Sequence, residues 1–146
     1  MIVSSLTCRA KRFPTRLSTD RGRIKGRLAD VSVAPIDEIT EGQRCDVMKL
    51  DVEGFEGEAL AGATRALESG MVAAIVEHSA PVPADSPAHA AMVCAGFSAF
   101  SYDPFARRLT ALPGPVPGNT IYVRDLPEVE QRVARALRRQ VVGIEF

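Results

Sequence analysis

Four polar side chains of the sequence follow two short apolar runs, where they could bind a polar ligand or exchange a proton with it. Asp51 and Glu53 follow the run 47–50, and Glu77 and His78 follow the run 71–76. Carboxylates and imidazoles are the side chains that most often act as general acids and bases. The same four groups could also hold a divalent cation, but the sequence itself predicts no metal site.

Each of these side chains also has a structural explanation. Glu53 could cap the helix that follows it, Glu77 could be a solvated strand end, and His78 could be a hydrogen-bonded loop histidine. Asp51 is the strongest functional candidate, because an acid at the end of a buried apolar run is costly unless it is paired or used. For Glu53, Glu77 and His78 both the functional and the structural explanation stay open.

A strand, a helix and a second strand position these groups. Residues 46–53 are mostly apolar and end at Gly54, which is typical of a buried parallel strand. Residues 57–68 predict a helix and residues 72–77 a second strand, so the unit is a parallel crossover. The helix has an apolar stripe of Leu60, Ala63, Thr64 and Leu67. Ligands bind beyond the carboxyl ends of such strands, so we expect the four polar groups to converge there.

Strand geometry adds a detail to this expected site. Asp51 and Glu53 are two residues apart, so they project to the same side for as long as the strand lasts. Lys49 should point away from the apolar side chains of Met48 and Leu50, which favours a structural role for it.

Further elements are predicted on both sides of this unit. An edge strand and a helical turn should precede it, and a helix, an antiparallel strand pair with a long connection and a terminal amphipathic helix should follow. Asp125 and Glu128 fit a capping box at the start of the terminal helix. The expected ranges are 31–36, 37–40, 86–95, 97–102 paired with 119–123, and 126–146.

The composition indicates one ordinary domain, because the chain has 146 residues, of which 46% are hydrophobic and 25% charged. No apolar stretch is long enough for a membrane helix and no secretory leader opens the chain, so we expect a cytoplasmic protein without a membrane partner. Three widely spaced cysteines are read as thiols.

The zero net charge hides a basic N-terminal segment. Residues 1–30 carry eight Lys and Arg against two Asp and Glu, whereas the remainder carries ten against sixteen. The segment lacks the interleaved aromatic residues of a single-strand binder, which argues against nucleic acid as the partner. We expect residues 1–30 to be poorly ordered or truncated, with an electrostatic binder as the alternative.

The central block resembles a known family. Residues 49–54, Lys-Leu-Asp-Val-Glu-Gly, are similar to the K-[IL]-D-[VI]-E-G signature of FkbM-type S-adenosylmethionine-dependent methyltransferases. Residues 33–39 resemble the family's V-x-x-L-D-x-[LI] segment, and Gly96-Phe97 its Gly-aromatic pair. The downstream E-x-x-x-L-x-G-A run is matched by Glu56, Glu58, Leu60, Gly62 and Ala63. The resemblance covers residues 31–125.

This resemblance implies an α/β fold of the Rossmann-like class I methyltransferase type, with residues 46–53 as its fourth strand and 72–77 as its fifth. It implies S-adenosylmethionine as cofactor and methylation of a hydroxyl group on a sugar or another small molecule. Asp51 would lie near the methionine end of the cofactor or near the acceptor. Glu53, Glu77 and His78 would bind or deprotonate the acceptor.

One element of the family pattern is missing. The family grips its cofactor through a first-strand motif of the form D-x-G-A-N-x-G, and no such glycine cluster occurs in this sequence. Residues 31–125 therefore read as the C-terminal half of a methyltransferase sheet, in a fragment or a shortened relative. The alternative function is a non-enzymatic half-domain that acts as an interaction module or an inactive fragment. Because its sheet edge is exposed, we expect the isolated chain to self-associate or to be partly unfolded.

Overall fold

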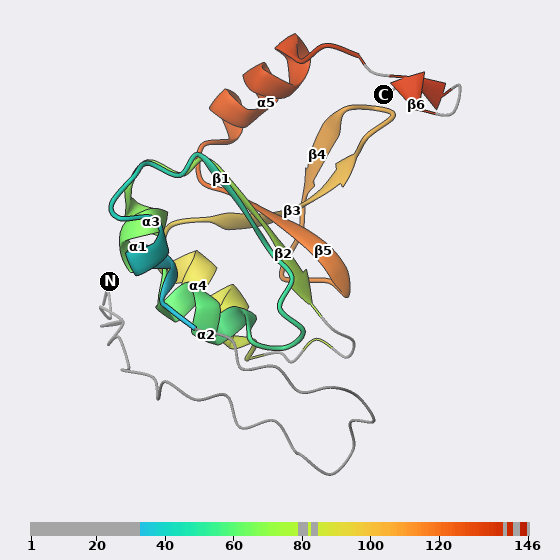
Figure 1. Cartoon of the computed structure of the whole chain (residues 1–146). Helices are drawn as coiled ribbons and strands as arrows, with labels where there is room; N and C mark the ends of the chain where they lie inside the picture. The colour runs from blue at the N-terminus through green and yellow to red at the C-terminus, as the bar shows by residue number, and fades with distance from the viewer. Residues whose placement is uncertain (1–32, 79–81, 83–84, 139, 142–143, 146) are drawn as a thin grey trace, which may run out of the picture.

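The computed structural model describes residues 33–78, 82, 85–138, 140–141 and 144–145. Within these described residues, five strands form one sheet in the order β1-β2-β5-β3-β4, and five helices accompany it (Figure 1). The sheet strands are β1 (Val47–Leu50), β2 (Ala73–His78), β3 (Ser98–Asp103), β4 (Arg108–Ala111) and β5 (Gly118–Val123). The helices are α1 (Ile36–Ile39), α2 (Glu56–Ala61), α3 (Thr64–Glu68), α4 (Pro87–Cys94) and α5 (Leu126–Arg135).

The predicted parallel unit is confirmed. β1 and β2 run parallel, in a register that places Val47 beside Ala73 and Leu50 beside Val76. β1 alternates exposed and buried residues, so Met48 and Leu50 enter the core and Lys49 points away from them, as expected. The strand ends at Leu50, earlier than the predicted 46–53. Asp51 therefore already belongs to the connection that leads into α2.

The crossover helix predicted over 57–68 is two short helices, α2 and α3, which meet at Gly62 and Ala63. The break is fixed by a distant segment, because Pro35 packs against Gly62 and the carboxylate of Asp37 accepts hydrogen bonds from the first turn of α3. The break also changes which side chains face inward. Thr64 is exposed, and Ala66 joins Leu67 in the core.

The main core lies between one face of the sheet and helices α2, α3 and α4. Strand residues of this face include Met48, Leu50, Ala74, Val76 and Tyr122. Helices α2 and α4 lie side by side, and a Cβ added at Gly57 would be 2.9 Å from the Cβ of Pro87 (Figure 1). This close approach requires glycine at position 57.

A smaller cluster occupies the other face of the sheet. Ala73, Phe100 and Val123 are buried there, and α5 packs Leu126 and Val129 against them. The first turn of α5 is capped as predicted, since the carboxylate of Asp125 accepts a hydrogen bond from the backbone N–H of Glu128 at 3.1 Å. Only part of this face is covered by α5, and Val47 of β1 keeps 55% of its surface exposed.

The C-terminal part differs from the prediction in two ways. The connection between β3 and β5 contains β4, which pairs with β3, and β5 lies between β2 and β3. The helix expected over 126–146 ends at Arg135, and a separate small sheet of β6 (Gln140–Val141) and β7 (Ile144–Glu145) follows. Arg107 contributes to this helix end, because its guanidinium donates to the carbonyl oxygens of Val133 and Ala136.

The remaining predictions fall on both sides of the parallel unit. The helix expected over 86–95 is α4, and the antiparallel pairing of 97–102 with 119–123 is that of β3 with β5. The helical turn near 37–40 is α1. The edge strand expected over 31–36 is not seen in its described residues, since 33–35 form no strand and Ile36 starts α1. The basic segment 1–30 and residues 31–32 lie outside the described residues.

Candidate functional site

Lys49, Asp51 and Glu77 form an acid cluster at the carboxyl ends of the two parallel strands. The ammonium of Lys49 lies 2.8 Å from Oδ2 of Asp51 and 3.8 Å from Oε2 of Glu77. Lys49 belongs to β1, Glu77 to β2, and Asp51 directly follows β1. The structure thus brings together two of the predicted site residues and joins them through a lysine.

The charges of this acid cluster stabilise one another. The hydrogen bond and the positive charge of Lys49 lower the pKa of the Asp51 carboxyl below its ordinary value, and the same hydrogen bond raises the pKa of Lys49. Asp51 is therefore a carboxylate at neutral pH and suits hydrogen-bond acceptance. The side chain of Asp51 is 45% exposed, so the burial cost expected for it does not arise.

Glu53 lies in the turn after β1 and does not join the acid cluster. It adopts φ +52° and Gly54 adopts φ +95°, so both lie in the left-handed region in the turn after β1. The expected projection of Asp51 and Glu53 to the same side does not apply, because the strand ends before either residue. Glu53 is exposed and does not cap α2, whose N-cap residue Phe55 has no side-chain hydrogen bond.

His78 lies on the opposite face of the sheet from Glu77 and is 6% exposed. Its Nε2 is 3.2 Å from the hydroxyl oxygen of Tyr122, which in turn is 3.0 Å from Nδ1 of His89. Burial lowers the pKa of His78, while the charge of Glu56 opposes that shift. The four predicted groups therefore do not converge. Two lie in the acid cluster, one in the turn and one in the core.

Three polar residues near the strand ends were not singled out as site residues from the sequence. Glu56 is buried, and its Oε1 accepts hydrogen bonds from the backbone N–H groups of Val52 and Gly54, both at 3.2 Å. Tyr122 and His89 complete the buried chain with His78. A tyrosine inside an apolar strand needs a hydrogen-bond partner when buried, which was the available signal for Tyr122.

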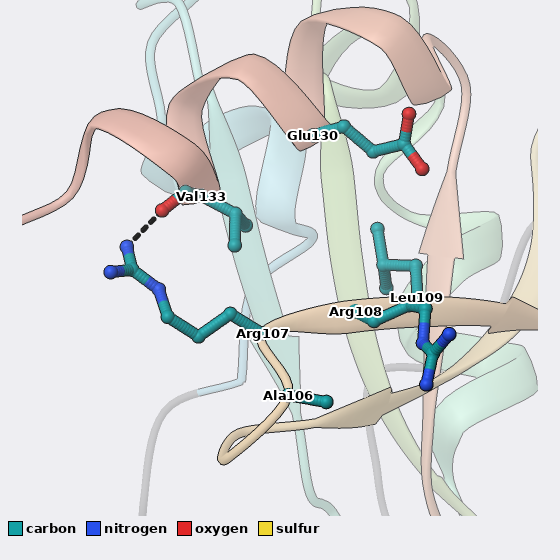
Figure 2. A pocket seen from close by; sticks show the side chains of 6 residues that line it. All are labelled: Ala106, Arg107, Arg108, Leu109, Glu130 and Val133. Carbon is teal, nitrogen blue, oxygen red and sulfur yellow. Dashed lines mark hydrogen bonds between the residues drawn. The ribbon is translucent and has the colours of Figure 1, made fainter. Parts of the chain in front are cut away.

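A cavity of about 300 Å³ lies away from these strand ends, between the β3–β4 hairpin and α5. Figure 2 shows Arg107 reaching α5 on one side of it, with Arg108 and Glu130 on the other. Its lining residues are Ala106, Arg107, Arg108, Leu109, Glu130 and Val133. None of the predicted site residues lines this cavity.

The described residues fit only part of S-adenosylmethionine. Carboxylates such as Asp51 and Glu77 complement its positively charged groups. The adenosine needs a glycine-rich loop, and the sequence contains no D-x-G-A-N-x-G. The three side chains of the acid cluster are 41–50% exposed rather than enclosed. Within the described residues no group of three or more His, Cys, Asp and Glu side chains could hold a metal ion.

The mixed α/β fold, with an acid cluster at the ends of a parallel strand pair, is consistent with the methyltransferase class. Residues 7–94, more than half of the chain, match the model of the methyltransferase FkbM domain. The chain belongs to the FkbM methyltransferase family, which confirms the resemblance in its signature block. The match begins upstream of the region 31–125 and shares residues 31–94 with it.

No curated protein and no solved structure gives a significant match to the chain. Among the described residues, no helix combines the length and the apolar character needed to cross a bilayer.

Proposed function

We propose that this chain forms the acceptor side of an S-adenosylmethionine-dependent methyltransferase that methylates a hydroxyl group of a sugar or another small molecule in the cytoplasm. One observation carries the proposal. Asp51, which follows β1, and Glu77, near the end of the parallel strand β2, share the ammonium of Lys49, and Lys49 and Asp51 belong to the signature block 49–54. The β1–β2 pair would then correspond to the fourth and fifth strands of a Rossmann-like sheet.

The residues of the acid cluster have different roles toward the acceptor hydroxyl. Asp51, kept ionised by Lys49, accepts a hydrogen bond from the acceptor hydroxyl or faces the positive end of the cofactor. Glu77 is the other carboxylate of the acid cluster and is the candidate to accept the proton of the acceptor hydroxyl. Lys49 donates a hydrogen bond to Asp51 and forms an ion pair with Glu77. Glu53 adds an exposed carboxylate in the turn after β1, and His78 stabilises the site from the core face of β2.

The proposal assigns no residue of this chain to binding the adenosine of the cofactor. When bound, S-adenosylmethionine would supply the methyl group, and this sequence offers no glycine-rich motif of the family's form to hold its adenosine. We therefore expect the 146-residue chain to show no binding at micromolar S-adenosylmethionine. Tight one-to-one binding by the chain alone would contradict this division.

Weak binding to the acceptor side can be mapped directly. The ¹⁵N-labelled chain is titrated with millimolar methyl glycosides and, separately, with millimolar S-adenosylmethionine, while amide chemical shifts are followed. We expect shifts at residues 50–54 and 77–78, and their loss in Asp51→Asn, which keeps the shape but removes the charge. The matched control is Asp103→Asn, an exposed acid at the end of β3.

The outcome separates the acid cluster from other surfaces. Shifts confined to residues 106–109 and 130–133 would assign binding to the hairpin cavity instead. Shifts that persist unchanged in Asp51→Asn, or no shifts with any probe, would remove the acid cluster from the proposal.

A second candidate is an interaction module, which the position of β1 favours. β1 is one of the two edge strands of the sheet, and Val47 is 55% exposed on its partly covered face. Unpaired edges of this kind promote association between chains. Sedimentation velocity should show concentration-dependent self-association that Val47→Lys reduces and Val93→Lys, on exposed α4 surface, does not. A monodisperse monomer at every concentration contradicts this candidate.

A further inference from the structure

The position of Asp51 depends on the turn that follows it. β1 ends at Leu50, so no ladder pairing holds Asp51 in place. The chain then reverses through Glu53 at φ +52° and Gly54 at φ +95°. Left-handed backbone at a residue other than glycine costs on the order of 1 kcal/mol or more and persists only where surrounding contacts impose it. Some contact must therefore hold residues 51–54 in this form.

Glu56 makes that contact. Its Oε1 accepts two hydrogen bonds, from the N–H groups of Val52 and Gly54, so two backbone donors of the turn point at a single oxygen atom. Successive N–H groups that converge in this way form a small anion-binding concavity. Glu56 is 8% exposed, and a buried carboxylate is tolerated when hydrogen bonds satisfy it.

We infer that Glu56 is a positioning residue, which holds the turn 51–54 and through it places Asp51 against Lys49 and Glu77. The inference deepens the proposed function, because the importance of this placement rests on the role given to Asp51. Glu58 lies in the same first helical turn, is exposed, and makes no hydrogen bond to the turn residues. Glu56 therefore differs from Glu58 in its hydrogen bonds to the turn and not in its position in the helix.

Glu56 also acts toward the buried face of the sheet. Its negative charge raises the pKa of His78 against the lowering that burial causes. The other groups around His78 are Tyr122 of β5 and His89 of α4, and the charge of His89 acts in the lowering direction. Glu56 thus touches the turn with its oxygen and influences the core histidine with its charge.

The experiment compares Glu56→Ala, Glu56→Gln and the control Glu58→Ala in the full chain. Amide hydrogen exchange is measured at Val52 and Gly54, and the pKa values of Asp51 and His78 are measured by NMR titration. Glu56→Ala should speed exchange at both amides about tenfold or more, which corresponds to about 1.4 kcal/mol of lost protection. It should also raise the pKa of Asp51 toward its ordinary value of 3.8, because the pairing with Lys49 loosens.

Glu56→Gln separates hydrogen bonding from charge. Its amide oxygen still accepts from the turn, so exchange at Val52 and Gly54 should stay slow, whereas the pKa of His78 should fall further. If Glu56→Ala proves unfolded, the Gln variant decides through the turn itself, because fast exchange at Val52 and Gly54 in a folded Glu56→Gln overturns the inference.

The inference also fails if Glu56→Ala leaves exchange and the pKa of Asp51 as in the wild type, or if Glu58→Ala changes them equally. None of these readouts depends on methyl transfer or ligand binding. The two proposals can also fail separately. If Glu56→Ala speeds amide exchange but the ligand-induced chemical shifts persist in Asp51→Asn, the positioning role stands and the proposed function is removed.

Discussion

The hydroxyl oxygen of Tyr122 lies 3.2 Å from Nε2 of His78, on the face of the sheet that α2 and α4 cover. Tyr122 is fully buried, and burial raises the pKa of its hydroxyl, so the phenol stays protonated. A neutral phenol donates one hydrogen bond and accepts another, which suits its place between His78 and His89. This chain of three side chains stabilises the core behind the acid cluster.

Protonation of His78 should destabilise the fold. Its pKa is lowered from an ordinary value of 6.5, mainly by burial, so the unfolded chain binds more protons than the folded chain just below that pH. The stabilisation is complete above pH 6.5 and is lost as the pH falls through the folded-state pKa. Urea midpoints between pH 5 and pH 8 should fall on acidification, and less steeply in His78→Gln. Parallel curves for the two proteins would rule out this contribution.

Arg124 should be among the most important charged residues for stability. Its Nη2 donates to the carbonyl oxygens of Leu67 at 2.6 Å and Ala95 at 2.9 Å, so one guanidinium caps the ends of α3 and α4. Hydrogen bonds from charged donors contribute about 1.5–3 kcal/mol each, so Arg124→Met should cost about 2–4 kcal/mol. Chemical denaturation measures this cost. Arg108→Met, at an exposed position, should change stability by less than about 0.5 kcal/mol.

Gly57→Ala should destabilise the chain although alanine is the better helix former. Alanine gains roughly 0.5–1 kcal/mol over glycine in a helix, but its Cβ would lie 2.9 Å from the Cβ of Pro87. Overpacking of this kind costs about 1–3 kcal/mol, so we expect a net loss of about 1 kcal/mol. Thermal melts compare this variant with Gly114→Ala, where no atom lies within 4 Å of the new Cβ. Equal melting temperatures for both variants would refute the steric argument.

Asp37 should stabilise a helix that starts 27 residues later in the chain. Its two carboxylate oxygens accept hydrogen bonds from the N–H groups of Arg65 at 3.0 Å and Ala66 at 2.9 Å. Asp37→Ala should cost about 1–2 kcal/mol, as the loss of an N-cap does, and Asp37→Asn less. The neighbouring exposed Glu38 provides the control Glu38→Ala. Denaturation midpoints that fall equally in both alanine variants would contradict a capping role.

The strands and helices that were predicted correctly are those whose apolar residues repeat locally. β1, β2, β3 and β5 are of this kind, whereas α4 was predicted from its bounds at Ser86 and Gly96. The parallel pairing followed from the strand–helix–strand order. β4 was not predicted because Arg108–Ala111 alternates polar and apolar residues over only four positions, and the strand is defined by its pairing with β3. The break between α2 and α3 depends on Asp37, which local periodicity does not reveal.

The candidate site was predicted in part for similar reasons. Asp51 and Glu77 meet because the ends of parallel strands meet, a relationship that the sequence order already contained. His78 was placed with Glu77 in error, since consecutive residues of a strand point to opposite faces. The role of Glu56 could not be predicted, because it depends on the left-handed turn at Glu53 and Gly54.

The place of β5 in the sheet has a consequence for synthesis on the ribosome. β5 is the last strand of the main sheet in the chain, yet it lies between β2 and β3 and pairs with both. Until residues 118–123 have left the exit tunnel, the β1–β2 pair and the β3–β4 hairpin have no strand to join them. Nascent chains stalled before residue 118 should therefore be protease-sensitive, and those that extend past Asp125 and clear the tunnel should resist cleavage within the sheet.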